Sequence, residues 1–386
     1  FYRQYVMKLV LNENRAPGVS GKELKNIAWI PSSSLYLNNR IFDENGSRDL
    51  VYQPFSELRK SFVKNGVNLD TYDIISNDVT VDVIIVTRID YNFKILLNLI
   101  KKNPMAKVIY IVTEEATVCP IHEKRVLKSH IFDRVVTWIP EWIDEEYFRH
   151  CFYPNPCREF CNRLNFNEKL HLVMINSYLK PKFNHTGELY SFRIKLARYF
   201  VDYGLDLYGS GWHEDSLVGG HAGYKGTVES KLSTMARYKF AFTIENTSNE
   251  NGAVTEKIFD AMSSGCVPVY AGAPDIELYI PAECFINAAK FDDFDSLNLY
   301  LKSVTESEYT AYLKAIEIFL SSEAYKGFTS TGYVRSIGRV VTECTEAAAP
   351  EAKNILKIRM EWLMKILIYP AIFIHRRRLL LDIILS

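Results

Sequence analysis

The sequence lacks several features that would mark a specialised class of protein. Lys and Arg together number 46, as do Asp and Glu, so no excess of positive charge favours nucleic acid as a partner. The seven cysteines are scattered and odd in number, which argues against a disulfide framework and favours a reducing compartment. The sequence contains no run of about 18 uncharged apolar residues, so no membrane-spanning helix is predicted. What is left is an ordinary globular composition over 386 residues, a length that suits two domains.

Metal-binding patterns are also scarce. Cys151, Cys157 and Cys161 are close in sequence, but no His/Cys pair follows at a usable spacing, so zinc is not expected. The acidic stretch 292–295 (DDFD) precedes a predicted helix, and helix capping explains it better than metal binding. We therefore expect neither a metal nor a cofactor. No role is predicted for the isolated histidines His122, His130 and His221.

The first half of the chain alternates strand and helix patterns. Val81–Val86 and Lys107–Val112 are β-branched runs of the kind found in a buried parallel sheet. Between them, Phe93–Lys102 has helical spacing, so the three segments predict a βαβ unit. Phe132–Trp138 predicts a further strand.

The same alternation resumes after the turn-forming stretch 153–156 (YPNP). We predict an α/β protein of two Rossmann-like domains, residues 1–160 and 161–345, facing a central cleft, with a helical tail over 346–386. Ligands of such open sheets bind at the carboxyl ends of the strands. The predicted strands are 170–175, 205–208, 240–244 and 267–270, and the predicted helices are 188–203 and 255–263.

The most informative chemistry lies where one of these strands ends and the next helix begins. Glu245 and Asn246 follow the strand, Thr255 is placed to cap the helix, and Glu256 and Lys257 fall in its first turn. A helix N-terminus favours anions, and Lys257 adds positive charge, which suits a diphosphate. Glu256 can accept hydrogen bonds from sugar hydroxyls. The alternative is a capped helix with two solvated charges.

A resemblance to a known family favours the first interpretation. The chain resembles the family 10 α-1,3/α-1,4-fucosyltransferases, of the bacterial type, well over 170–328 and weakly in its first half. The segments that carry this resemblance are Tyr238-Lys239-Phe240, Glu245-Asn246, Val254-Thr255-Glu256-Lys257-Ile258-Phe259-Asp260, Gly265-Cys266-Val267-Pro268-Val269-Tyr270 and, upstream, Glu188-Leu189-Tyr190, Arg193 and Asp206-Leu207-Tyr208-Gly209.

The resemblance implies a GT-B fold and an inverting transfer of L-fucose, without metal. The donor would be GDP-fucose and the acceptor a glycan, with O3 of GlcNAc or Glc as the expected hydroxyl. The stretches 32–39 and 52–62 would shape the acceptor cleft. By the same resemblance, Arg193 and Lys257 hold the diphosphate, Lys225 is a further phosphate contact, Glu256 holds sugar or ribose hydroxyls, and Glu245 and Asn246 line the nucleotide pocket.

Inversion also requires a general base for the acceptor hydroxyl. In the family this base is a glutamate that follows a strand of the first domain. Here Glu114 and Glu115 follow the strand 107–112, and the spacing to Pro120 fits Glu114 better. Glu115 is the competitor, and the alternative is that both are solvated loop acids.

One position departs from the family pattern. Many members carry Tyr before the Val-Thr-Glu-Lys element, and this chain has Ala253. By resemblance that Tyr packs against the donor, so its loss puts the identity of the donor sugar in doubt. The alternatives are a family relative that uses another sugar nucleotide, and a catalytically weak nucleotide- or glycan-binding protein.

The two ends of the chain give sequence evidence on the cellular compartment of the protein and on its contact with a membrane. Residues 355–386 place apolar side chains around Arg376-Arg377-Arg378, which is typical of an amphipathic segment in peripheral contact with a membrane. The alternative is a helix that packs back on the first domain. The chain begins with Phe1 rather than Met, so the question of whether a segment precedes Phe1 stays open. We expect a cytoplasmic or peripheral membrane enzyme of protein glycosylation or lipopolysaccharide biosynthesis if bacterial, and a Golgi-lumen enzyme if eukaryotic with an upstream anchor.

Overall fold

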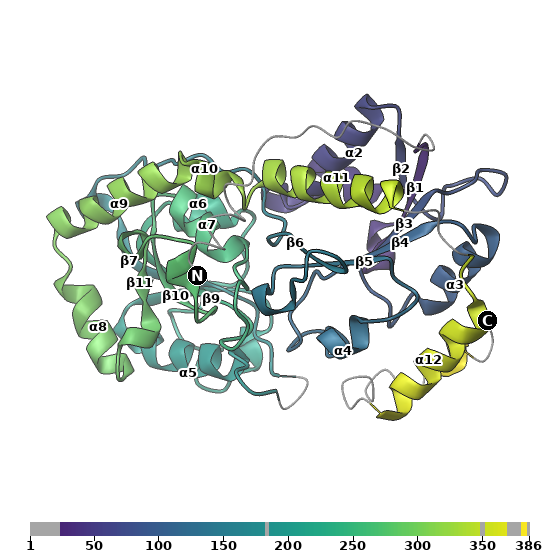
Figure 1. Cartoon of the computed structure of the whole chain (residues 1–386). Coiled ribbons are helices and arrows are strands. Elements are labelled where there is room, and N and C mark those ends of the chain that lie inside the picture. The colour runs from purple at the N-terminus through teal and green to yellow at the C-terminus, as the bar shows by residue number, and fades with distance from the viewer. Residues whose placement is uncertain (1–23, 182–184, 348–351, 369–379, 384–386) are drawn as a thin grey trace. The chain divides into compact units, whose positions relative to one another are not determined.

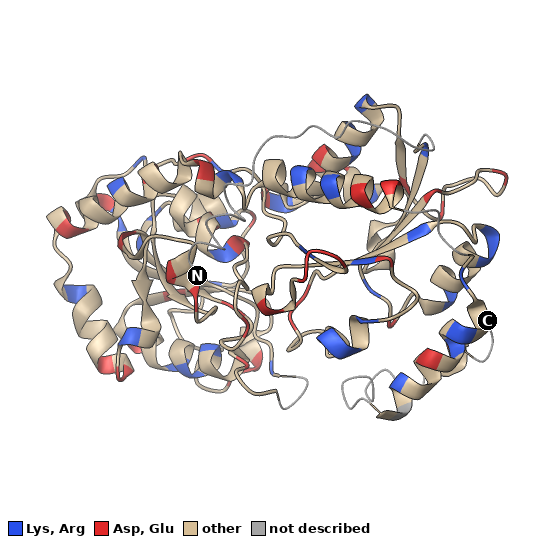
Figure 2. Ribbon diagram, viewed as in Figure 1, with Lys and Arg blue, Asp and Glu red and all other residues tan. Residues whose placement is uncertain are grey.

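The computed structural model describes residues 24–181, 185–347, 352–368 and 380–383 (Figure 1). The described chain forms two compact units, one of residues 153–329 and the other of residues up to 152 together with those from 330 onward. The divisions thus lie at Tyr153 and Ser330, where the sequence suggested 160/161 and 345/346. Acidic and basic side chains are interspersed along the helices of both units, in keeping with the balanced composition (Figure 2).

The first unit, formed by the described residues up to 152 and from 330 onward, is built on a parallel sheet of order β2-β1-β3-β4-β5-β6. Burial of both faces explains the unbroken apolar runs in its central strands. Its strands are β1 (Asn26–Ile30), β2 (Asn68–Thr71), β3 (Val83–Val86), β4 (Lys107–Ile111), β5 (Arg134–Thr137) and β6 (Phe148–His150), and the helices before residue 152 are α2 (Gln53–Lys64), α3 (Phe93–Lys102) and α4 (Lys124–Leu127).

Helix α11 (Ser330–Glu346) explains why the division falls at Ser330. Its apolar side chains, including Tyr333 and Ile337, belong to the same buried cluster as Trp29 of β1 and Leu58 of α2. The ring of Tyr333 lies 5.6 Å from that of Phe55. The helix therefore completes the core of this unit, although it follows the other unit in sequence.

Helix α12 (Ile355–Ile368) packs on the same unit. Ile358, Trp362 and Ile366 are buried. The Trp362 indole N–H donates to Ser129 Oγ over 3.1 Å, and its ring lies 5.3 Å from that of Phe93. The described part of the tail is thus a docked helix, as the second of the two interpretations had it.

Membrane contact through residues 355–386 therefore has no support from the described part of that segment. Arg376-Arg377-Arg378, on which the membrane interpretation depended, lie outside the described residues. In the part of the chain that is described, no helix combines the length and the apolar character needed to cross a bilayer.

The second unit holds a parallel sheet of order β11-β10-β9-β7-β8. Helix α7 connects β9 to β10, so it begins near the carboxyl edge of the sheet. The strands are β7 (Leu170–Ile175), β8 (Leu205–Tyr208), β9 (Tyr238–Ile244), β10 (Val267–Ala271) and β11 (Ile286–Asn287), and the helices are α5 (Tyr190–Phe200), α6 (Lys231–Met235), α7 (Glu256–Ser263), α8 (Phe294–Ser303), α9 (Glu306–Leu320) and α10 (Glu323–Lys326).

The acidic stretch 292–295 acts as a helix cap, as predicted. Asp293 is the N-cap residue of α8 and accepts from the Ser296 N–H over 2.8 Å. Helices α8 and α9 are separated by two residues. Val304 adopts an extended conformation, and Thr305 starts α9 with a capping box that includes Glu308.

Candidate functional site

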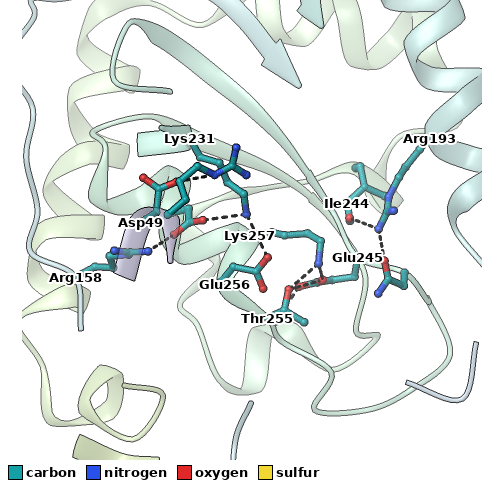
Figure 3. A network of polar contacts seen from close by, with 12 residues as sticks. Asp49, Arg158, Arg193, Lys231, Ile244, Glu245, Thr255, Glu256 and Lys257 are labelled. Atoms are coloured by element: carbon teal, nitrogen blue, oxygen red, sulfur yellow. Dashed lines mark hydrogen bonds and ion pairs between the residues drawn. The ribbon is translucent and has the colours of Figure 1, made fainter. Parts of the chain in front are cut away.

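The second unit gathers charged side chains where β9 ends and α7 begins (Figure 3). Glu245, the first residue after β9, is fully buried. Its carboxylate accepts from the Thr255 N–H over 2.9 Å and from Lys257 Nζ over 2.8 Å. A buried carboxylate needs such partners because the loss of hydration would otherwise be costly. Glu245 therefore fixes the path of the chain into α7 and the position of Lys257.

Thr255 has a different role from the predicted one. It occupies the N-cap position of α7, but its side chain makes no capping hydrogen bond. Its hydroxyl instead donates to Glu245, with oxygen–oxygen distances of 2.9 and 2.7 Å. The hydroxyl oxygen accepts from Lys257 Nζ over 2.9 Å, so Thr255 links Glu245 to Lys257 rather than capping the helix.

Arg193 reaches the same strand end from α5. Its side chain is buried, and Nη2 donates to the Ile244 carbonyl and to Asn246 Oδ1, each over 2.8 Å (Figure 3). The guanidinium carbon also lies 5.0 Å from the ring centroid of Tyr190. The structure thus brings Arg193, which is distant in sequence, to the segment that holds Glu245, Asn246 and Lys257.

Further charged residues of this unit surround Glu256 (Figure 3). Lys231 Nζ lies 3.4 Å from Glu256 Oε1 and 3.5 Å from Asp260 Oδ2. Arg158 Nη2 lies 3.1 Å from Asp260 Oδ1. The sequence analysis gave no role to Lys231, Arg158 or Asp260, although Asp260 ends one of the segments that carry the family resemblance. The spacing of Glu256 and Asp260, four residues apart on one helix face, is a second signal for Asp260.

Glu256 is held as a carboxylate. Burial raises its pKa, but the charges of Lys257 and Lys231 and a backbone hydrogen bond outweigh burial and lower the pKa to about 2. The side chain is 21% exposed. An ionised carboxylate has only acceptor positions, so at neutral pH Glu256 can receive hydrogen bonds from hydroxyl groups.

Two other predicted donor residues are placed differently. Lys225 is 40% exposed, and its Nζ lies 3.3 Å from Asp206 Oδ1. Asp206 in turn accepts from the Tyr238 hydroxyl over 2.7 Å. Ala253 is buried in the loop between β9 and α7.

The first unit carries Glu114 and Glu115 beyond the end of β4, as the sequence predicted. Glu115 is buried, whereas Glu114 is partly exposed. The Glu115 carbonyl accepts from the N–H groups of Val118 and Cys119, each over 2.9 Å. Within the described ranges, no three His, Cys, Asp or Glu side chains converge as metal ligands would.

Comparison with known proteins bears on the second unit. Residues 189–331 match the model of the glycosyltransferase family 10 (fucosyltransferase) C-terminal region. An α-(1,4)-fucosyltransferase of Arabidopsis thaliana is 41% identical over 83 residues, 20% of this chain and 20% of the relative. An α-(1,3)-fucosyltransferase of Helicobacter pylori is 36% identical over 86 residues, 22% of this chain and 18% of the relative. The matches thus span about a fifth of the relatives' length, and they support family 10 without deciding a bacterial origin.

A solved structure extends the likeness to the whole fold. The crystal structure of an α1,3-fucosyltransferase with GDP-fucose has a TM-score of 0.52 to this chain, covers 92% of it and 100% of that protein, and is 15% identical. At this identity the likeness shows the fold alone. The predicted GT-B-like α/β fold with two parallel sheets is confirmed.

Proposed function

We propose that the chain is a glycosyltransferase family 10 fucosyltransferase that transfers L-fucose from GDP-fucose to a hydroxyl of a glycan, with inversion. The observation that carries this proposal is the pair of cations, Arg193 and Lys257, at the end of β9 and the start of α7. Both lie within the stretch that matches the family model.

In the proposed reaction the second unit binds the donor. Arg193 and Lys257 hold the diphosphate, because a guanidinium and an ammonium beside a helix N-terminus complement its charge. They also stabilise the charge that GDP gains as the bond to the sugar breaks. Glu256 accepts hydrogen bonds from sugar or ribose hydroxyls, and Asn246 lines the nucleotide pocket. Glu245 does not contact the donor directly in this account, since its carboxylate anchors Thr255 and Lys257.

The first unit supplies the base. The acceptor oxygen attacks the anomeric carbon of fucose as the bond from that carbon to the phosphate oxygen breaks. GDP leaves with the electron pair, and the proton of the acceptor hydroxyl passes to the Glu114 carboxylate. Glu114 suits this task better than Glu115, because Glu115 is buried whereas Glu114 is partly exposed. No step calls on a metal.

The linkage is the finer part of the proposal. We infer an α-1,3 product on O3 of GlcNAc or Glc, although the relatives include an α-(1,4)-fucosyltransferase and an α-(1,3)-fucosyltransferase. The bacterial-type assignment, the roles in protein glycosylation or lipopolysaccharide biosynthesis and the expected locations stay predictions. Ala253 favours one alternative, a relative that uses another sugar nucleotide, because it replaces the Tyr predicted to pack on the donor sugar.

A transfer assay tests this proposal. The protein is incubated with GDP-fucose, GDP-mannose or UDP-glucose and a panel of oligosaccharides ending in GlcNAc or Glc, and the products are analysed by mass spectrometry and NMR. We expect a fucosylated product with an α linkage to O3, formed equally well with EDTA. Transfer from GDP-mannose alone would favour the alternative donor, and GDP binding with no transfer to any acceptor would favour a binding protein.

A further inference from the structure

The loop that carries Glu114 also carries a buried histidine, His122. The loop leaves β4 after Ile111 and reaches α4 at Lys124. His122, near its far end, is almost fully buried. We propose that His122 is a positioning residue that fixes Glu114 for proton transfer. This inference rests on the proposed function, in which Glu114 is the base.

Two hydrogen bonds make the connection. His122 Nδ1 lies 2.6 Å from the carbonyl oxygen of Glu114, and His122 Nε2 lies 2.8 Å from the hydroxyl of Tyr110. Tyr110 belongs to β4 and is fully buried, with its ring 5.0 Å from that of Phe132. The rigid strand thus holds the imidazole, and the imidazole holds the backbone of Glu114.

The partners determine the tautomer. A carbonyl oxygen can only accept, so Nδ1 must carry the proton that is donated to Glu114. In the neutral ring Nε2 is then the acceptor, and the Tyr110 hydroxyl donates to it. The chain of donors runs from Tyr110 through His122 to Glu114. With the other tautomer, a lone pair on Nδ1 would face the carbonyl oxygen at 2.6 Å.

The imidazole stays neutral in this place. Burial is the largest influence on the pKa of His122 and lowers it, and the charge of Arg88 lowers it further. The hydrogen bond to Glu114 and the charge of Asp90 raise the pKa, but they do not offset burial, and the pKa is about 4. Asp90 and Arg88 pair with each other, with 2.9 Å between Arg88 Nε and Asp90 Oδ1. His122 therefore does not act as a general acid near neutral pH. Its contribution is to hold the Glu114 backbone in position through its hydrogen bond.

A base needs such support because proton transfer is sensitive to position. A misplacement of about 1 Å can lower the rate about 100-fold. The loop makes other internal bonds, including that from the His122 N–H to the Cys119 carbonyl over 2.9 Å. The bond from the His122 ring joins the Glu114 backbone to a side chain anchored in the sheet.

Kinetics on three variants test the inference. His122→Leu removes both hydrogen bonds, Tyr110→Phe removes only the donor to Nε2, and His122→Asn retains an N–H close to the place of Nδ1–H. We expect kcat to fall about 100-fold in His122→Leu, less in Tyr110→Phe, and to recover in part in His122→Asn, with an unchanged KM for GDP-fucose. The matched control is His150→Asn, because His150 is also a histidine with a pKa lowered to about 4 by burial, but it lies on β6.

A spectroscopic measurement makes the result independent of whether a variant folds. Long-range ¹⁵N–¹H correlations of histidine-labelled wild-type protein should show a neutral ring in the Nδ1–H form at pH 6 whose signals are absent from His122→Asn. An Nε2–H or charged ring for His122 would overturn the inference, as would an unchanged kcat in a folded His122→Leu variant. A wild-type protein that transfers no sugar would instead overturn the proposed function and with it the role of Glu114. The two failures are therefore distinguishable.

Discussion

The two units place charge at their strand ends in contrasting ways. At the end of β9, the cations Arg193, Lys257, Lys231 and Arg158 lie among the carboxylates Glu245, Glu256 and Asp260. Beyond β4, by contrast, the backbone of Glu114 is held by a neutral group, the imidazole of His122, which is bound in turn by the hydroxyl of Tyr110. A site for a diphosphate needs fixed positive charge, whereas a base needs a fixed position and a carboxylate open to substrate.

The largest expected effect concerns the base. Glu114→Gln keeps the shape of the side chain but removes the proton acceptor, so kcat should fall about 10³-fold to 10⁴-fold while GDP binds as in the wild type. Steady-state kinetics and GDP titration measure the two quantities. Glu115→Gln is the matched control, and an equal loss of kcat in that variant alone would move the role of base to Glu115.

The stability of the first unit is expected to depend on its docked helix. Trp362→Ala leaves a cavity beside Phe93 and removes the donor to Ser129, which should cost about 3–5 kcal/mol of unfolding free energy. Urea denaturation measures this change. Met360→Ala on the same helix is the control, because Met360 is 59% exposed and should change stability by less than about 1 kcal/mol. Equal stability of the two variants would mean that α12 does not dock in solution.

A pH-dependent effect separates the neutral histidines of the first unit from the carboxylate of the second. The pKa values of His122 and His150 are lowered by burial to about 4, so between pH 4 and the ordinary histidine value of 6.5 the unfolded chain binds more protons. Unfolding free energy should therefore fall as the pH falls from 6.5 to 4. The pKa of Glu256, lowered to about 2, adds a loss that begins only below pH 4.5. Denaturation of wild type and of a His122→Asn, His150→Asn variant across this range checks the sign, and identical pH profiles would contradict it.

Much of the fold was predictable because buried parallel strands leave a clear pattern. The runs that became β3, β4, β7, β9 and β10 are predominantly apolar. The strands β1, β2, β6 and β11 were not predicted. β2 reads NLDT, with polar residues at three of its four positions, and β6 has three residues. Such segments become strands through their neighbours in the sheet rather than through their own pattern.

The candidate site was predictable where the family pattern is local, and not where tertiary contacts form it. Glu256 and Lys257 were proposed because they stand in the first turn of a predicted helix. Lys231 and Arg158 come from other segments, and only the folded chain brings them to Asp260. His122 looked isolated in sequence because its partner Glu114 contributes a backbone carbonyl, which no side-chain motif records.

The central claim is a metal-free donor site built on Lys257, and calorimetric titration with GDP tests it most directly. The samples are wild type, Lys257→Ala and Lys326→Ala, each with and without EDTA. Lys326 is the matched control, because it has no predicted contact with the donor and its exposed ion pair with Glu323 should contribute less than about 1 kcal/mol. The account predicts GDP binding that is insensitive to EDTA, about 10-fold to 100-fold weaker in Lys257→Ala and unchanged in Lys326→Ala. GDP binding that disappears with EDTA, or that is as tight in Lys257→Ala as in wild type, would contradict it.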